Sequence, residues 1–214
     1  MIVEQIMNKE VKTLKPDHTL EQAIAMMSEK RIRHIPIVSD DDVLVGIISD
    51  RDVKEASPSI FQLHNSLDDL KKPLKKIMKT NVITGHPLDF VEEVSAIFFE
   101  HKIGCLPILK QGKIVGIVTE SDLLHTFVQL TGANQPGSHI EVKVSNVSGV
   151  LAEVAGIFQK RRVNISSVLL YPAVDENDKV LVFRVQTMNT SPLISDLESA
   201  GYDVLWPNMQ GKLT

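Results

Sequence analysis

The sequence predicts an α+β protein in which two copies of one unit precede a third, different unit. The main observation is a repeat: residues 32–53 recur as residues 103–123, with apolar, proline, glycine and acidic positions in the same order. A second observation is a turn-rich stretch at 131–138, which separates the copies from a C-terminal part with its own pattern. We therefore expect a first repeat with its connector at 1–70, a second repeat at 71–130, a linker at 131–137 and a third domain at 138–214.

Composition is typical of a folded protein from a reducing compartment. An apolar fraction of 43% in 214 residues is enough for a buried core. A net charge of -4 and a pI near 6.0 give no general electrostatic reason to bind nucleic acid or an anionic membrane. The N-terminus lacks the features of a signal peptide, no stretch approaches the length of a membrane span, and Cys105 is the single cysteine. We expect a cytoplasmic protein.

The first repeat is expected to run strand, helix, strand, strand, helix. An extended segment at 11–14 stops at a proline, and a helix follows that Asp17 or Thr19 can cap, with Gln22 completing a T-x-x-Q box. A hairpin follows around the acidic turn 40–42. Its second strand is expected to bury every other residue, namely Val43, Val45 and Ile47. The S-x-x-D sequence that begins at Ser49 marks the start of the next helix.

The second repeat has the same pattern. Its elements are expected as an extended segment at 82–84, a helix at about 89–101, a hairpin of 106–109 and 114–118, and a helix capped by the T-x-x-D sequence from Thr119. Because neither unit can bury both of its faces alone, we expect a pseudo-twofold pair rather than two separate domains. The connection carries a basic cluster, which is interpreted as a solvated face: the lysines at 71, 72, 75, 76 and 79.

The third unit has the order strand, helix, strand, strand, helix, strand. The expected elements are strands at 139–145, 165–174, 180–187 and 202–206, with helices at 150–160 and after Ser191. This order predicts a ferredoxin-like βαββαβ fold, with both helices on one face of the sheet.

The repeated motifs carry a family resemblance. Both copies have an h-P-h strand, at Pro36 and Pro107, and both have a G-h-h-[ST]-x-x-D stretch, at 46–52 and 116–122. The pair resembles tandem CBS domains, the arrangement called a Bateman module. The resemblance implies two clefts between the units, which commonly hold adenosine-containing ligands such as AMP, ATP or S-adenosylmethionine.

The residues themselves suggest roles toward such a ligand. Carboxylates accept hydrogen bonds from ribose hydroxyls, the role assigned to Asp52 and Asp122. Ser49 and Thr119 begin helices, where backbone N–H groups favour a phosphate. The strands that contain Pro36 and Pro107, together with the extended segments at 11–13 and 83–84, are expected to form an apolar slot for adenine. The candidate ligand-binding residues are Thr13, Arg33, His34, Pro36, Ser49, Arg51, Asp52, Thr84, Pro107, Thr119, Ser121 and Asp122.

The two motifs are not equal. Three positions differ between them, with Arg33, His34 and Arg51 in the first motif opposite Gly104, Cys105 and Ser121 in the second. The first motif therefore looks better equipped for anions. Asp50 and Glu120 work against polyphosphates, so AMP, or a cationic sulfonium ligand at the second site, fits at least as well as ATP. The alternative is that both S/T-x-x-D boxes are helix caps only. That alternative leaves Gly46 and Gly116 unexplained.

The third unit resembles an ACT domain, a small regulatory fold that often pairs between subunits and binds amino acids at the interface. The resemblance rests on 146–151, which stands where the family has D-x-x-G-x-L, and on an N-I pair at the second strand. The implied ligand residues are Asn146, Gly149 and Asn164. Asn in place of Asp removes the partner of an ammonium group, and Gly149 permits a tight turn. We expect this domain to form a homodimer rather than to bind a second ligand.

This domain order is similar to regulatory proteins of acetoin utilisation, which implies a role in acetoin or butanediol catabolism, during stationary phase or sporulation. Catalysis has little support, because the seven histidines are scattered and Ser49 and Thr119 have no evident base. The acidic run 40–42 is explained by a turn without a metal. We therefore expect a non-enzymatic sensor that acts on an unidentified protein partner. The alternatives are an oligomerisation scaffold with vestigial clefts and an amino-acid sensor acting through the ACT domain.

Overall fold

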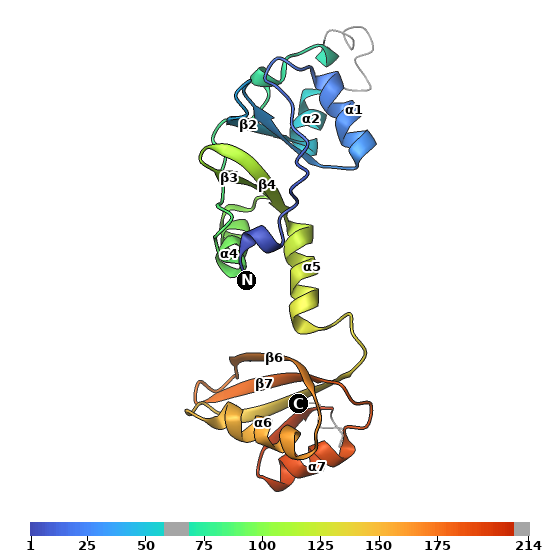
Figure 1. Ribbon diagram of the computed structural model, residues 1–214, viewed down its shortest axis with the longest axis vertical. Coiled ribbons are helices and arrows are strands. Elements are labelled where there is room, and N and C mark those ends of the chain that lie inside the picture. The colour runs from blue at the N-terminus through green and yellow to red at the C-terminus, as the bar shows by residue number, and fades with distance from the viewer. Residues whose placement is uncertain (58–68, 208–214) are drawn as a thin grey trace. The chain divides into compact units, whose positions relative to one another are not determined.

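The computed structural model describes residues 1–57 and 69–207, which form two compact units (Figure 1). Unit 1 comprises Met1–Leu124 and unit 2 His125–Thr214, so the boundary falls inside one helix, α5. Within the described ranges, no helix combines the length and the hydrophobicity needed to cross a membrane.

Unit 1 contains the two repeats. The first has η1 (Val3–Gln5), α1 (Leu20–Lys30), β1 (His34–Val38), β2 (Leu44–Ser49) and α2 (Asp50–Ala56); the second has η2 (Leu74–Lys76), α4 (Val91–His101), β3 (Cys105–Lys110), β4 (Lys113–Thr119) and α5 (Glu120–Thr131). Both hairpins are antiparallel, as expected, and lie side by side, with Val43 bridging Lys113 between them (Figure 1). Helices α1 and α2 lie beyond one hairpin and α4 beyond the other.

Local capping explains where three helices begin. The Thr19 hydroxyl accepts a hydrogen bond from Gln22 N, while the Gln22 side chain accepts one from Thr19 N, which completes the predicted box. Ser49 and Asp52 form the same reciprocal pair at α2, and the Thr119 side chain accepts from the third residue of α5. Capping depends on neighbouring residues only, which is why the sequence patterns located these helix starts.

The extended segments at 11–14 and 82–84 do not form the predicted strands. The first makes a single parallel bridge to a hairpin, Leu14 with Ile37, and next to the second the bridge is made by the residue that follows it, Gly85 with Ile108. Leu14 N donates to Pro36 O at 3.2 Å and Val38 N donates to Leu14 O at 2.9 Å. The ladder cannot extend by another pair because the next donor would be the nitrogen of Pro36, which has no hydrogen.

The beginning of each repeat packs into the core of the other repeat. Val3 is fully buried in the cluster of the second repeat, where Ile6 and Met7 also pack. Leu74 is fully buried in the cluster of the first repeat, together with Ile77 and Met78. Backbone hydrogen bonds fasten both segments, and Leu74 N to His18 O at 2.8 Å is one example. The expected pair is therefore one intertwined unit.

Gly46 and Gly116 allow this exchange. A Cβ on Gly46 would lie 2.7 Å from Met78 Sδ and 3.0 Å from Lys79 O, and a Cβ on Gly116 would overlap Met7. Ile47 and Lys79 exchange two backbone hydrogen bonds of 2.9 Å beside the first contact. The two glycines thus have a packing role that sequence analysis did not foresee, so they no longer argue for a ligand.

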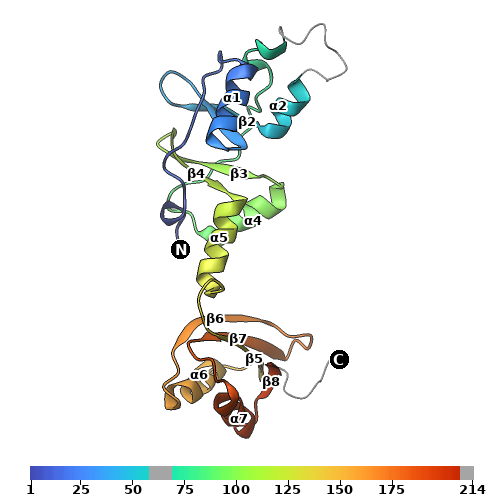
Figure 2. The same ribbon diagram turned by 90° about the vertical axis from the view of Figure 1, so that its right-hand side faces the viewer.

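Unit 2 has the predicted βαββαβ order. Its elements are β5 (Ser138–Ser145), α6 (Val150–Lys160), β6 (Ile165–Pro172), β7 (Asp178–Val185), α7 (Ser191–Ser199) and β8 (Asp203–Trp206). The sheet order is β6-β7-β5-β8, with every neighbouring pair antiparallel. Both helices lie on the same face of the sheet (Figure 2), where Phe158 of α6 meets Phe183 of β7 with ring centroids 4.5 Å apart. This is the ferredoxin-like fold.

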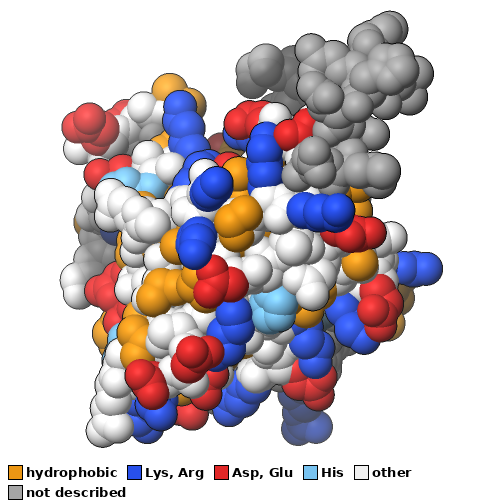
Figure 3. Space-filling view, turned by 90° about the horizontal axis from the view of Figure 1, so that it is seen from above, with side chains coloured by type: hydrophobic (Ala, Val, Ile, Leu, Met, Phe, Trp, Pro, Cys, Tyr) orange, Lys and Arg blue, Asp and Glu red, His pale blue; other side chains and the backbone are white. Residues whose placement is uncertain are grey.

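The face of the molecule seen in Figure 3 mixes acidic and basic side chains. Several of the lysines in the predicted basic cluster make ion pairs. Lys72 lies 2.7 Å from Asp69, and Lys75 lies 2.7 Å from Asp17. The mixture agrees with the near-neutral composition and forms no single-sign patch on that visible face.

Candidate ligand clefts between the two repeats

In the described part of unit 1, two hollows each lie next to one S/T-x-x-D box. The hollow called here the Asp122 cleft has a volume of about 240 Å³ and is lined by Asn8, Glu10, Val11, Lys12, Arg31, Ile32, Arg33, His34, Pro36, Gly104, Ile117, Thr119, Ser121 and Asp122. The Asp52 cleft has a volume of about 320 Å³ and is lined by Arg33, His34, Ile47, Ser49, Asp50, Arg51, Asp52, Lys79, Lys102, Ile103, Gly104, Cys105 and Glu120. Both volumes lie near the lower end of the ~300–1,000 Å³ of ligand pockets.

Most of the candidate residues line one of these clefts. Arg33, His34, Pro36, Thr119, Ser121 and Asp122 line the Asp122 cleft, and Arg33, His34, Ser49, Arg51 and Asp52 line the Asp52 cleft. Three candidates, Thr13, Thr84 and Pro107, line neither. The extended segment contributes Val11 and Lys12 in place of Thr13.

Each cleft is built from both repeats. The Asp122 cleft joins the box of the second repeat to the extended segment of the first, and the Asp52 cleft joins the box of the first repeat to residues 102–105 of the second. This follows from the exchanged N-terminal segments. Arg33 and His34 line both clefts, so of the three differences expected to favour anions at the first motif only Arg51 opposite Ser121 is confined to one cleft each.

Asp52 is held tightly in its cleft. Its Oδ2 accepts hydrogen bonds from Ser49 N at 2.8 Å and Ser49 Oγ at 2.5 Å, and its Oδ1 lies 3.0 Å from Lys79 Nζ. Desolvation by burial acts to raise the pKa of Asp52, but the hydrogen bonds from Ser49 and the ammonium of Lys79 outweigh it and lower the pKa. Asp52 is thus an ionised acceptor whose side chain is only 10% exposed.

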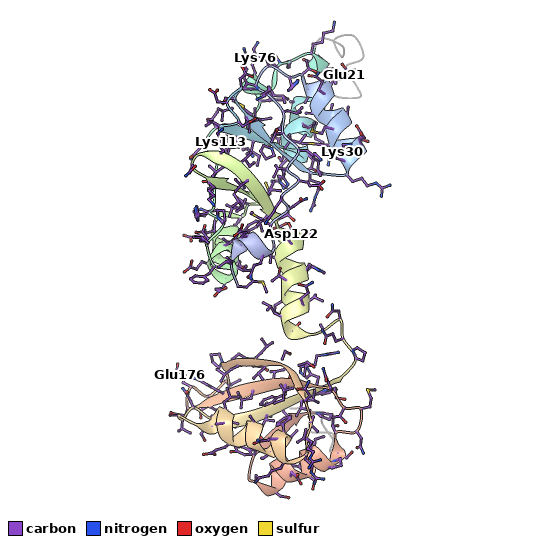
Figure 4. All side chains as sticks on the ribbon, in the orientation of Figure 1. Glu21, Lys30, Lys76, Lys113, Asp122 and Glu176 are labelled. Atoms are coloured by element: carbon purple, nitrogen blue, oxygen red, sulfur yellow. The ribbon has the colours of Figure 1, made fainter. Side chains whose placement is uncertain are left out.

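Asp122 occupies the equivalent position at the N-terminal end of α5 (Figure 4). Its Oδ2 accepts from Thr119 N at 2.8 Å and from Thr119 Oγ1 at 2.6 Å. The residue that corresponds to Lys79 in this cleft is Asn8, whose side chain accepts from Glu10 N at 2.9 Å. The same carboxylate geometry therefore shares its cleft with an amide side chain at Asp122 and is paired with an ammonium at Asp52.

The start of α2 is less suited to a phosphate than predicted. Asp50 N donates to Arg33 O at 2.8 Å, and Asp52 N donates to Ser49 Oγ at 3.3 Å. The helix has only seven residues, so its dipole is weak. Side-chain cations, Arg33 and Arg51 among them, are better placed to meet an anion in the Asp52 cleft.

Lys79 is the functional candidate that sequence analysis missed. It belongs to the lysine cluster interpreted as a solvated face, yet it lines the Asp52 cleft and pairs with Asp52. The signal that could have found it is the repeat itself, because Lys79 aligns with Asn8 immediately after the conserved pair of apolar residues in each copy.

Two further side chains in the clefts have altered pKa values. Burial, followed by the neighbouring Arg33 charge, lowers the pKa of His34, so its imidazole is neutral at pH 7. His34 packs against Gly104, where an added Cβ would lie 2.9 Å from its ring. Burial raises the pKa of the Cys105 thiol to about 12, which makes it unreactive. Among the described residues, no group of three His, Cys, Asp or Glu side chains is arranged to hold a metal ion.

A hollow of about 330 Å³ lies beside the start of α6 in the described part of unit 2. Lys143, Glu153 and Tyr202 are among its lining residues, but the predicted Asn146, Gly149 and Asn164 are not. Gly149 takes the left-handed conformation at φ 91°, as its predicted turn role requires, and Asn164 Nδ2 donates to Gln186 Oε1 at 2.9 Å. These residues have structural contacts and do not converge on the hollow.

Comparison with protein families identifies the two units. The model of the CBS domain matches residues 3–59 and 74–129, and that of the ACT domain matches residues 138–201. The chain is a tandem CBS-domain protein with a C-terminal ACT domain. The CBS domain pair corresponds to the two repeats of unit 1 and the ACT domain to the ferredoxin-like sheet of unit 2.

Several known proteins are similar to the CBS domain pair. A CBS domain-containing protein of Dictyostelium discoideum is 34% identical over 143 residues, which cover 64% of this chain and 99% of that protein. The crystal structure of a protein assigned to acetoin utilization (AcuB) from Vibrio cholerae is 35% identical with a TM-score of 0.55, covering 63% of this chain and 96% of the other. The CBS domain pair of protein MJ0100, solved with 5-methylthioadenosine and S-adenosyl-L-methionine, is 29% identical with a TM-score of 0.52, covering 63% and 98%.

Enzymes that carry CBS domains match over a small part of their length. The homoserine O-acetyltransferase of Methanococcus vannielii is 36% identical over 126 residues, which are 24% of that protein. Its activity therefore does not carry over to this CBS-domain regulatory protein.

Proposed function

We propose that this protein is a non-enzymatic sensor that binds an adenosine-containing ligand in its CBS clefts. The observation that carries the proposal is the placement of Asp52 and Asp122, which are both anchored by their capping residues at the wall of a hollow. An anchored carboxylate still has lone pairs to accept hydrogen bonds from both hydroxyls of a ribose. The adenosyl ligands in the structure of MJ0100, a relative at 29% identity, support the same ligand class.

Of the candidate ligands, AMP and S-adenosylmethionine fit the charges of the clefts better than ATP. The Asp52 cleft contains three carboxylates, those of Asp50, Asp52 and Glu120, and four basic side chains, so its lining has a surplus of one positive charge. A triphosphate carries more negative charge than this surplus can offset, unless a divalent ion screens it. A monophosphate needs fewer cationic partners, and a sulfonium group is attracted by the carboxylates.

The regulated process is proposed to be acetoin or butanediol catabolism, in the cytoplasm. Support comes from the AcuB structure, which is 35% identical over nearly its whole length. The CBS domain pair would respond to the adenosyl ligand and act on a protein partner of that pathway. Ligand occupancy would shift an equilibrium between two arrangements of the pair only to the extent that the ligand binds one of them better.

The ACT domain is proposed to hold two copies of the chain together. Strand β6 is an edge strand of the sheet, and the side chains of 168–171 are each between 38% and 46% exposed. An exposed apolar edge strand is prone to pair with another chain. A homodimer would cover this edge, and size-exclusion chromatography with light scattering would reveal its mass.

Isothermal titration of the full chain with AMP, ATP, S-adenosylmethionine and a set of amino acids tests the sensor proposal. At least one adenosine compound should release or absorb heat. Asp52→Asn and Asp122→Asn should each weaken binding in one cleft by about tenfold or more, because each removes a charge-assisted acceptor worth roughly 1.5–3 kcal/mol. Asp17→Asn is the matched control, since Asp17 is an exposed carboxylate paired with Lys75 and lines neither cleft.

The alternative is an oligomerisation scaffold whose clefts stay empty. The Lys79 ammonium, which already neutralises Asp52, is the observation in its favour. For a scaffold, titrations with all adenosine compounds would be flat, and Asp52→Asn would change only stability, by about 1 kcal/mol for a weakened cap. A response to amino acids alone would instead favour sensing by the ACT domain.

A further inference from the structure

The charges of the Asp122 cleft leave one cation in excess. Its lining contains the basic residues Lys12, Arg31 and Arg33 and the acidic residues Glu10 and Asp122. His34 adds no charge at pH 7 because burial lowers its pKa. If Arg33 is set aside, the remaining charges of this lining cancel.

The Asp52 cleft has the same excess from the same residue. Its acidic residues are Asp50, Asp52 and Glu120, and its basic residues are Arg51, Lys79, Lys102 and Arg33. Lys79 is committed to Asp52 at 3.0 Å. Without Arg33 the charges of this lining also cancel, so one guanidinium supplies the surplus positive charge of both clefts.

Arg33 lies where the two clefts meet. Its backbone is fixed, because Arg33 O accepts a hydrogen bond from Asp50 N at 2.8 Å, and its neighbour His34 packs against Gly104. Arg33, His34 and Gly104 are lining residues of both clefts. The position that corresponds to Arg33 in the second repeat is Gly104, so the pair has one arginine where exact symmetry would give two. Its exposed guanidinium makes no hydrogen bond or ion pair to a side chain in the described part of the chain, so it is available to a ligand.

We propose that the two clefts compete for Arg33, so that phosphate-bearing ligands bind with negative cooperativity while uncharged adenosine binds the clefts independently. This inference rests on the proposed function. The first phosphate recruits the guanidinium as a charge-assisted, bidentate partner. The second phosphate then meets a lining without net charge and is repelled by the first, over a separation that salt screens only in part.

Titration of the full chain with AMP and with adenosine separates the phosphate from the base and sugar. For the unmodified chain, the second AMP should bind at least about tenfold more weakly than the first, beyond the statistical factor, which is the loss expected for one charge-assisted hydrogen bond. Adenosine should bind both clefts without this gap. In Arg33→Gln, the first AMP step should weaken by about tenfold and the second should stay unchanged, so the difference in affinity between the two steps should narrow to the part caused by repulsion between the phosphates.

Two matched variants serve as controls because each changes an arginine of one cleft only. Arg31 lines the Asp122 cleft and Arg51 lines the Asp52 cleft. Arg31→Gln and Arg51→Gln should each weaken AMP binding in one cleft but leave Arg33 shared by both, so the difference in affinity between the two AMP steps should persist in these variants. Far-UV circular dichroism confirms that each variant is folded.

The outcomes separate this inference from the proposed function. Equal weakening of both AMP steps in Arg33→Gln would overturn the inference, since it would mean two independent contacts. A gap of the same size with adenosine, or no gap with AMP, would also overturn it while leaving the sensor proposal intact. Two adenosine molecules but only one AMP per chain would support it strongly. No heat with either compound would overturn both proposals.

Discussion

Replacing Gly46 with alanine should destabilise unit 1 by about 1–3 kcal/mol, the range for overpacking a core. The added Cβ would lie 2.7 Å from Met78 Sδ and 3.0 Å from Lys79 O. The methionine side chain can rotate away, but the carbonyl cannot, because Lys79 and Ile47 exchange two backbone hydrogen bonds of 2.9 Å. The strain therefore falls on the backbone that carries Lys79 into the Asp52 cleft.

Gly116 provides the matched comparison. The three atoms nearest to its added Cβ all belong to the Met7 side chain, with no backbone atom among them, so Gly116→Ala should cost less than Gly46→Ala. The double variant with Met7→Ala should recover the overpacking part of the loss at Gly116. Met78→Ala should fail to rescue Gly46→Ala, because the contact with the Lys79 carbonyl remains.

The chain allows the two units to be followed separately. Trp206 is the single tryptophan and, like both tyrosines, lies in unit 2. Tryptophan fluorescence during denaturation therefore reports on unit 2, while far-UV circular dichroism reports on both. Gly46→Ala should shift the dichroism transition and not the fluorescence transition.

Gly156→Ala is the reverse control: Gly156 lies within α6 with no atom near its added Cβ, so the substitution should stabilise unit 2 by about 0.5–1 kcal/mol. An unchanged transition for Gly46→Ala, or full rescue by Met78→Ala, would refute the reasoning.

Three further predictions follow from burial. The pKa of His34 is lowered in the folded state by burial and then by Arg33, so the stability that the neutral imidazole contributes is complete above the unfolded pKa of about 6.5 and is lost as the pH falls. His34→Gln should therefore flatten the decline in the denaturation midpoint of unit 1 between pH 8 and pH 5. An identical decline in the variant would contradict this. Cys105, whose thiol pKa is raised to about 12 by burial, should resist alkylation by iodoacetamide at pH 8 until denaturant unfolds unit 1, as mass spectrometry would show. Phe158→Ala should destabilise unit 2 by about 3–5 kcal/mol, measured by Trp206 fluorescence, because Phe158 is fully buried against Phe183.

The order of elements could be predicted from the sequence because it depends on local patterns. Thr19, Ser49 and Thr119 cap the helices that follow them, and the βαββαβ order of unit 2 fixed its fold. The buried face of β2 could not be predicted in the same way. The pattern 43–47 placed Val43 inside, yet Val43 is 42% exposed and Ile48 is fully buried. A register shift between Ile37 and Val38 changes the phase of the hairpin, and such a shift leaves no periodic signal.

The candidate site was only partly predictable. The boxes at Asp52 and Asp122 could be located because the cap and the proposed ligand contact use the same residue types. The composition of each cleft depends on which repeat supplies the other wall, and that is decided by long-range packing of Val3 and Leu74. Lys79 was assigned to a solvated face for the same reason, since only the exchange brings it to Asp52.

The exchange also explains how a duplicated chain comes to have two unlike clefts. If each cleft belonged to one repeat, a substitution in one copy would alter one site. Because residues of both repeats line each cleft, Arg33 changes both sites at once, whereas Lys79 changes the site of the opposite box and leaves its counterpart at Asn8 untouched. Divergence at these positions therefore changes two properties separately: the pair at Lys79 and Asn8 sets the charge facing each carboxylate, and Arg33 sets how the two sites depend on each other.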